Sequence, residues 1–339
     1  MNIWQKLKKD EKPFLCLAPM EEVTDTVFRQ MVATLRQAQG HGPNVMFTEF
    51  VNVEGLMSVG REEVIKRLRY EEIERPIVAQ IWGKNPENFY EAAKLIKKLR
   101  FDGVDINMGC PVKDVVKNGC CIALINNRSL AAEIIAAVKE GAGSASRRMP
   151  VSVKTRIGLD KIITEDWCGF LLEQKLDALT VHGRTAKEKS DVPAHWDEIA
   201  KVVEIRNEKL VDTVIVGNGD VRNAQDARLK AREYGVDGMM IGRGVLESIN
   251  AFSPQPTMLS PQENINLLRE HVRLWEKTWG KTKNFAIMKK FVKAYVKGWE
   301  GAGELRARLF EVKNGGEMEE VLRCLLDKVR NYFEQNPND

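Results

Sequence analysis

The stretch DTVIVGNGDVRNAQDARLKAREYGVDGMMIGRG, residues 212–244, contains one complete strand–helix–strand unit. Apolar runs at 212–219 and 237–244 flank a segment of helical period at 223–235. A continuous apolar strand followed by an amphipathic helix is typical of a parallel sheet whose faces are covered by helices. This stretch therefore predicts an α/β protein.

The same unit recurs upstream. Helical patterns at 86–99 and 129–140 separate further apolar runs. Eight repeats favour a closed (β/α)8 TIM barrel over an open doubly wound sheet. The other six expected strands are FLCLAPM (14–20), VMFTEF (45–50), IVAQIWG (77–83), GVDINMG (103–109), VSVKTRIG (151–158) and ALTVHGR (178–184).

After Gly244 the alternation stops. A Pro-rich stretch at 252–261 resembles a linker, and only helical patterns follow. The expected division of the 339 residues is a catalytic barrel at 1–250, a linker at 251–262 and an all-helical domain at 263–339. The helical patterns cover 263–279, 285–299, 303–312 and 317–333.

Composition restricts the class of protein. Apolar residues make up 43% of the chain, but no apolar run approaches the ~20 residues that cross a bilayer. The N-terminus has no signal-peptide pattern. Six scattered cysteines and four histidines show no metal-ligand spacing. We expect a cytoplasmic protein with free thiols, no metal and no membrane contact, and a monomer.

The ends of the expected strands carry polar or glycine residues, and in a closed barrel these ends converge on one rim. VGNGD (216–220) and IGRG (241–244) predict a phosphate site there, because glycines let backbone N–H groups approach an anion and Arg243 adds a cation. Ordinary glycine turns are the alternative. Gln80, Lys154 and His182 are placed to face a flavin ring. Each could instead be a packed polar residue.

The segment INMGCPVKDVVKNG (106–119) places Cys110 in a Gly-Cys-Pro turn after the fourth strand. A free cysteine has a pKa near ~8.5, so at neutral pH its thiol is mostly protonated and can act as an acid. The alternative is a small buried hydrophobic residue.

Together these segments resemble the tRNA-dihydrouridine synthase family. The signatures occur in the family's order along the barrel. They are LAPMEEVTDTVFR (17–29), AQIWG (79–83), NMGCPVKDVVKNG (107–119), VKTRIG (153–158), VHGRT (181–185), GNGDV (217–221) and IGRG (241–244). The resemblance implies FMN in the barrel mouth, NADPH as reductant, and tRNA as substrate, whose uridines are reduced at the C5=C6 bond by an oxidoreductase (EC 1.3.1.-).

The resemblance also implies roles for single residues. Cys110 occupies the position of the proton donor, and Lys113 and Arg184 are plausible substrate-side cations. There are two departures from the family pattern. Glu22 stands where a small residue is common. The Cys120-Cys121 pair stands where small Gly or Ala residues are usual, and we interpret its thiols as packed under the rim, with a redox-sensitive pair as the alternative. The implied FMN contacts are Pro19, Met20 and Glu21 at the first strand, Gln80, Lys154 and His182 at the ring, and Asn218, Gly219, Asp220, Gly242 and Arg243 at the phosphate end.

The C-terminal helical region is basic. Nine Lys or Arg residues against two Glu residues lie between Ile265 and Lys297. Lys289, Lys293 and Lys297 repeat at four-residue spacing, which places them on one face of an expected helix. A stripe of one sign suits a phosphate backbone, so Lys289 and Lys293 are expected tRNA contacts. A solvated surface is the alternative.

Two rival functions remain open. One is an FMN barrel acting on free pyrimidines, similar to a dihydroorotate dehydrogenase, which would need no basic helical region. The other is a non-catalytic RNA-binding barrel, for which Cys110 and Lys154 would serve no purpose.

Overall fold

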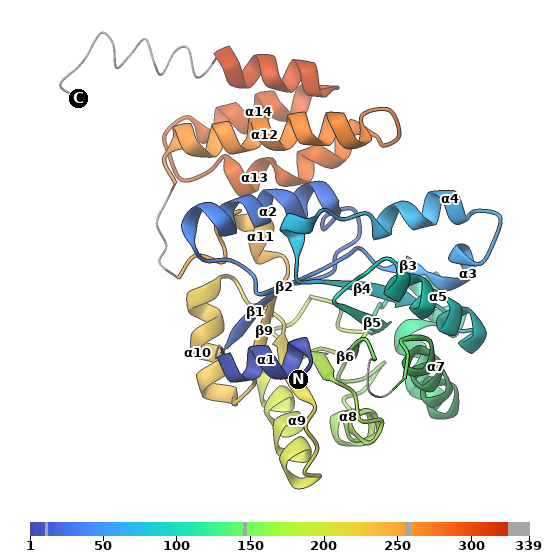
Figure 1. Cartoon of the computed structure of the whole chain (residues 1–339). Helices are drawn as coiled ribbons and strands as arrows, with labels where there is room; N and C mark the ends of the chain where they lie inside the picture. The colour runs from blue at the N-terminus through green and yellow to red at the C-terminus, as the bar shows by residue number, and fades with distance from the viewer. Residues whose placement is uncertain (11–12, 145–147, 255–258, 325–339) are drawn as a thin grey trace.

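Over the residues that the computed structural model describes (1–10, 13–144, 148–254 and 259–324), eight parallel strands close into a barrel (Figure 1). Consecutive barrel strands pair with one another, including β2 with β4, and pairing of the first strand, β1, with the last, β9, closes the ring. All eight predicted strands are confirmed. They are β1 (Phe14–Leu17), β2 (Val45–Phe47), β4 (Ile77–Trp82), β5 (Gly103–Met108), β6 (Val151–Arg156), β7 (Ala178–His182), β8 (Val214–Asn218) and β9 (Gly238–Ile241).

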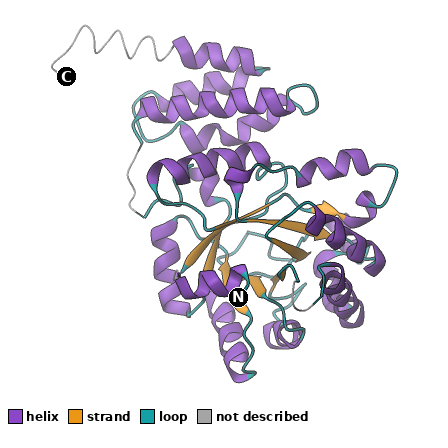
Figure 2. Cartoon of the chain, viewed as in Figure 1, coloured by secondary structure: helices purple, strands orange, loops and turns teal. Residues whose placement is uncertain are grey.

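Helices surround this ring (Figure 2). The longer ones are α2 (Thr26–Gln39), α5 (Pro86–Lys98), α7 (Arg128–Gly141), α8 (Thr164–Glu173), α9 (Trp196–Glu208) and α10 (Ala224–Tyr234). Short elements that the sequence did not predict are β3 (Val51–Asn52), α3 (Val53–Leu56), α4 (Arg61–Val64), η1 (Ile65–Leu68), η2 (Glu72–Glu74), α6 (Lys113–Lys117), η3 (Cys121–Asn126) and α11 (Gly244–Glu247).

No single helix in the described part of the chain is long and apolar enough to cross a membrane. Two helical segments, 113–126 and 128–141, would together be long and apolar enough, by length and composition alone, but they are bent by 91° relative to each other.

An N-terminal helix, α1 (Ile3–Asp10), closes one end of the barrel. Trp4 is 1% exposed and packs against Phe14 and Phe47, at ring-centroid distances of 6.1 and 6.2 Å. The same helix is fixed to residues that directly precede strands, through Asn2 to Asp177 and Lys8 to Asp237. The amino ends of the strands are therefore covered, and the opposite rim is left for a site.

The C-terminal helices pack on α2, as Figure 1 shows. Phe28 of α2 stacks on Phe291 with ring centroids 4.9 Å apart, and a single apolar cluster runs through both regions. The expected linker begins inside this packing, because Phe252 is 4% exposed. Residues 255–258 of that linker lie outside the described part. The elements here are α12 (Pro261–Trp279), the 3₁₀ helix η4 (Phe285–Phe291), α13 (Val292–Tyr295), α14 (Ala302–Glu311) and a helix at 315–324.

The prediction of one α-helix over 285–299 is wrong. Phe285, Met288 and Phe291 are buried, and their spacing of three residues matches the 3₁₀ period, so η4 directs all three into the core. The backbone then passes through one α-helical turn and a positive φ of 83° at Gly298. Lys289, Lys293 and Lys297 therefore do not share one α-helical face. The predicted helix at 317–333 is described only as far as residue 324.

Candidate functional site

A cavity of about 970 Å³ opens at the carboxyl ends of the strands. Its volume is at the upper end of the range for small-molecule and cofactor sites. Strand β6 and the loops after β1, β5, β7, β8 and β9 contribute to it. Ten predicted site residues line it, namely Pro19, Met20, Lys154, His182, Arg184, Asn218, Gly219, Asp220, Gly242 and Arg243.

The other predicted site residues lie elsewhere. Cys110 is half-buried directly beside the cavity, and the adjacent Pro111 lines it. Glu21 turns outward to an ion pair with Arg67 at 2.7 Å. Gln80 is fully buried inside the barrel, Lys113 is exposed, and Lys289 and Lys293 belong to the C-terminal helices.

Two of the cavity-lining turns need glycine. Gly219 has a φ of 126°, and a Cβ atom there would come within 2.7 Å of the Ala194 Cβ. A Cβ on Gly244 would lie 2.2 Å from the Arg222 carbonyl oxygen. The helix that follows, α11, has only four residues, so it adds little of the dipole expected at a phosphate site. Backbone N–H groups and Arg243 are the anion-binding groups that remain.

Arg184 organises its neighbours from a buried position, with only 2% of its surface exposed. Its Nε donates to the Val192 carbonyl at 2.6 Å, and it forms an ion pair with Asp220. Its Nη1 lies 3.0 Å from His182 Nε2. A guanidinium can only donate, so His182 Nε2 accepts and the ring proton sits on Nδ1. Burial, together with the nearby cations, holds the pKa of His182 well below its ordinary value, and the ring is neutral.

Asp220 is likewise committed to its neighbours. One carboxylate oxygen accepts from Arg184 and from the Ala194 N–H, and the other accepts from Arg243 at 3.3 Å. A carboxylate paired with two arginines orients these cations, but it has no hydrogen-bond donor for a phosphate. The geometry therefore favours a positioning role for Asp220 and Arg184 over direct ligand contact.

Lys154 is a cavity-lining cation without a direct partner, although the negative charge of Asp105 favours its protonated form. Its side chain is partly exposed and has no hydrogen-bond or ion-pair partner among the described residues. Burial, together with the Arg156 charge, lowers the pKa of the amine to about 8, so at neutral pH it remains mostly protonated. A half-buried cation without a direct partner is costly, and an anionic ligand in the cavity would compensate it.

The turn that carries Cys110 is held from two sides. Asn107 Oδ1 accepts from the backbone N–H groups of Gly109 and Cys110, both at 3.0 Å. Arg156 Nε donates to the Gly109 carbonyl at 2.9 Å, and its Nη1 reaches the carbonyls of Thr185 and Lys189. Arg156 thus joins two loops of the rim. The sequence holds a signal for this role, because Arg156 follows Lys154 by two residues in β6 and residues two apart in a strand share one face.

A second thiol lies against Cys110. Cys121 is 1% exposed, and its hydrogen bond to Cys110 is the main cause that lowers the pKa of Cys110 to about 7. The Val112 N–H and the Arg156 and Lys154 charges act in the same direction, against the effect of burial. The pKa of Cys121 is raised well above its usual value, so Cys121 stays protonated and is the donor. Both predicted packed thiols are buried, and the Cys120 thiol faces the Asn118 carbonyl instead.

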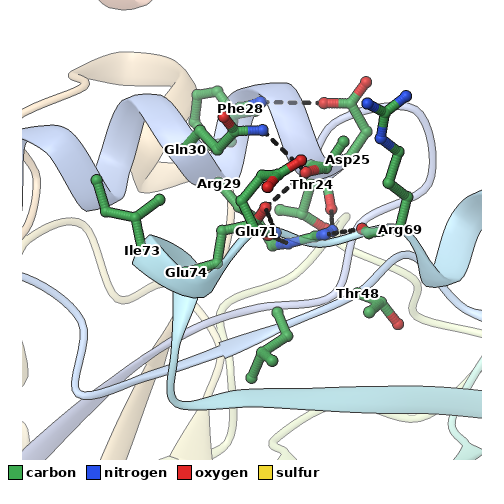
Figure 3. Close-up of polar contacts among 12 residues, drawn as sticks. Thr24, Asp25, Phe28, Arg29, Gln30, Thr48, Arg69, Glu71, Ile73 and Glu74 are labelled. Atoms are coloured by element: carbon green, nitrogen blue, oxygen red, sulfur yellow. Dashed lines mark hydrogen bonds and ion pairs between the residues drawn. The ribbon is translucent and has the colours of Figure 1, made fainter. Parts of the chain in front are cut away.

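The first-strand loop is fixed by a buried ion pair (Figure 3). Arg29 and Glu74 are both fully buried and pair at 2.6 Å. Arg29 also donates to the Thr24 carbonyl at 2.5 Å, and the Thr24 hydroxyl accepts from the Met20 N–H at 2.8 Å. The pair therefore anchors Met20 at the cavity wall, and each charge has further hydrogen bonds, as a buried charge requires.

A closed parallel barrel with a cationic cavity at the carboxyl ends of its strands defines an α/β-barrel protein of the enzyme type. The model of the family described as "Dihydrouridine synthase (Dus)" matches residues 16–330. The chain belongs to this family.

A "Probable tRNA-dihydrouridine synthase" of Staphylococcus aureus (strain COL) is 39% identical over 99% of this chain and 98% of its own length. "Probable tRNA-dihydrouridine synthase 2" of Bacillus subtilis (strain 168) is 40% identical over 98% of both. The structure of DHODH in complex with ferulenol from Eimeria tenella matches with a TM-score of 0.47 and 15% identity, covering 68% of this chain and 76% of the other. The fold assignment rests on the strand pairing.

Proposed function

We propose that this protein is a tRNA-dihydrouridine synthase, which uses FMN and NADPH to reduce the C5=C6 bond of uridines in tRNA. The observation that carries the proposal is the partnerless Lys154 amine in a large cavity with the Cys110 turn beside it. Membership of the dihydrouridine synthase family and the names of the relatives support it.

FMN fits the residues present. Lys154 and the Nδ1–H of His182 would contact the flavin ring, where a cation stabilises the reduced, anionic form. Gly219, Gly242 and Arg243 would hold its phosphate. Met20 and Pro19 would contact it from the first strand, and Asn218, whose Nδ2 is fixed by the Met240 carbonyl at 2.9 Å, keeps its Oδ1 as an acceptor. When bound and reduced by NADPH, FMN supplies a hydride to C6 of the uracil.

Cys110 would then donate a proton to C5. The thiol lies at the rim beside Lys154 and Arg156, and with a pKa of about 7 it can lose its proton near neutral pH. A group titrating near the working pH is an effective proton donor, because it combines adequate acidity with a populated protonated form.

Binding of tRNA would use cations that border the cavity. Lys293 pairs with Glu247, a cavity-lining residue, and Lys290 pairs with Glu22 of the first-strand loop. The basic helical region therefore begins where the cavity ends. This arrangement favours a macromolecular substrate over a free pyrimidine, which would need no such surface, and it lets one extruded base enter the site.

The proposal is tested by incubating purified protein with FMN, NADPH and tRNA lacking dihydrouridine, and mapping the product by mass spectrometry. We expect a yellow protein that forms dihydrouridine in tRNA and not from free uridine or orotate. Turnover of free pyrimidines alone would favour the dihydroorotate dehydrogenase-like rival. A colourless protein that binds tRNA would favour the non-catalytic one.

Cys110→Ala is the matched catalytic variant. Loss of a positioned proton donor costs about 100- to 10,000-fold in rate, so dihydrouridine formation should fall by at least about 100-fold. FMN content, read from absorbance, and tRNA affinity should remain within about twofold of wild type. Unchanged product formation would remove Cys110 from its proposed role.

A further inference from the structure

One buried carboxylate inside the barrel does not line the cavity, and its charge acts on Lys154. Asp105, the third residue of β5, is fully buried between Gln80 of β4 and Ser152 of β6. Its Oδ1 accepts from the Ser152 hydroxyl at 2.6 Å, and its Oδ2 accepts from Gln80 Nε2 at 2.7 Å. Burial raises the pKa of Asp105 to about 6, so at neutral pH it is still mainly an acceptor on both oxygens.

Asp105 begins a chain of hydrogen bonds that ends at Cys110. Gln80 Oε1 accepts from Asn107 Nδ2 at 3.0 Å, and Asn107 Oδ1 accepts from the Gly109 and Cys110 N–H groups. Every link has a direction, because each amide side chain has one donating end and one accepting end.

The groups at the two ends of this series of hydrogen bonds require the same orientation of the two amide side chains. A carboxylate only accepts, so Gln80 must turn its NH₂ toward Asp105 and its carbonyl toward Asn107. Backbone N–H groups only donate, so Asn107 must turn its carbonyl toward the Cys110 turn and its NH₂ toward Gln80. Reversal of either amide would break a bond on each side of it.

We propose that Asp105 is a positioning residue, which through Gln80 and Asn107 holds the Gly109–Cys110 turn so that the Cys110 thiol keeps its place at the cavity rim. This inference rests on the proposed function for its catalytic meaning. The sequence carried a signal for it, since Asp105 is a charged residue in the middle of a strand, between the apolar Val104 and Ile106. It also explains why Gln80 is buried in the barrel and does not line the cavity.

The rival explanation is that Asp105 only stabilises the barrel. The two are separated by a readout on Cys110 itself, namely the pH dependence of its alkylation by iodoacetamide in FMN-free protein, followed by mass spectrometry of the Cys110 peptide. A purely structural role lowers the melting temperature and leaves this alkylation profile unchanged.

Asp105→Leu removes the acceptor that starts the chain, and Asp105→Asn keeps one carbonyl for Gln80. We expect the Asp105→Leu variant to shift the alkylation midpoint of Cys110 by at least half a pH unit. Its kcat for dihydrouridine formation should fall about tenfold or more, with KM for tRNA within about twofold of wild type. Asp105→Asn should keep the alkylation midpoint of Cys110 and the kcat for dihydrouridine formation close to their wild-type values. Ser152→Ala, which touches the same carboxylate outside the chain, is the control and should leave the midpoint in place.

Gln80→Met removes the next link in the series of hydrogen bonds, and it replaces Asp105→Leu in the experiment if that variant does not fold. Wild-type alkylation midpoints in both Asp105→Leu and Gln80→Met would overturn the inference. Absence of dihydrouridine formation by the wild-type protein would instead overturn the proposed function, and the alkylation profiles would still decide whether Asp105 positions Cys110.

Discussion

At the scale of single residues, the site contains local strain. Cys121 has a φ of 54°, in the left-handed region that costs a non-glycine residue about 1–2 kcal/mol. Its side chain is buried, and its thiol donates to Cys110. A glycine would adopt this backbone without strain, and strained residues cluster at functional sites. The strain therefore accompanies the thiol that lowers the pKa of Cys110.

Cys121→Gly tests that link. The substitution suits the backbone and removes the hydrogen bond that contributes most to the lowered Cys110 pKa. The alkylation midpoint of Cys110 should rise from about 7 toward the ordinary value near ~8.5. Cys120→Ala removes the neighbouring thiol, which faces the Asn118 carbonyl, and should leave the midpoint unchanged. Equal shifts in the two variants would contradict the assignment.

At the scale of elements, one buried histidine of α12 contacts three other helices. His271 of α12 lies between Phe28 of α2 and Phe291 of η4, at ring-centroid distances of 5.9 and 4.7 Å. Its Nδ1 is 3.0 Å from the hydroxyl of Tyr295 in α13. Burial lowers the pKa of His271 to about 3, so the ring is neutral in the folded protein. The packing of the C-terminal helices on α2 therefore depends on an uncharged ring.

This packing predicts acid sensitivity. Unfolded His271 takes up a proton near pH 6.5, whereas the folded residue does so only near 3. The contribution of His271 to the free energy of unfolding is thus complete above pH 6.5. It falls as the pH decreases, by up to about 1.4 kcal/mol per pH unit. Urea unfolding at pH 7.5 and 5.5 should show a flatter dependence for His271→Gln than for wild type.

His182, whose pKa is also lowered, contributes equally to both proteins and cancels in the comparison. Parallel pH dependences for wild type and His271→Gln would show that His271 is accessible to protons in the folded state.

At the scale of the whole molecule, ion pairs redistribute the basic charge of the C-terminal region. Most of its cations bind carboxylates from outside the 265–297 segment, so the excess of nine cations over two Glu residues in that segment is not a free positive stripe. Lys289 donates to the Phe310 carbonyl at 2.5 Å. The pairs are Lys290 with Glu22, Lys293 with Glu247, Arg269 and Arg273 with Glu319, and Lys283 near Asp25 and Glu49. Several of them join the helical region to the barrel rim.

Two variants separate charge from structure at this junction. Lys293→Gln and Glu247→Gln break the same ion pair, but only the first removes a cation. If Lys293 contacts a phosphate, Lys293→Gln should weaken tRNA binding and reduce the slope of log affinity against log salt by about 1. Glu247→Gln should bind tRNA at least as well as wild type. Equal weakening in both would mean that the ion pair matters only for the docking of the helices.

The sequence by itself determined the eight strands, their order and the rim on which the site lies, because strand and helix periods are local patterns. It also identified ten of the residues that line the cavity, since they lie at the strand ends or directly after them. Tertiary structure alone decided the closure of the amino end by α1, the 3₁₀ form of η4 and the burial of Gln80. It likewise decided which lysines remain free, since Lys290 meets Glu22 across 268 residues of sequence. Hydrogen bonds and ion pairs between distant residues leave no periodic pattern in the sequence, and only folding brings their partners together.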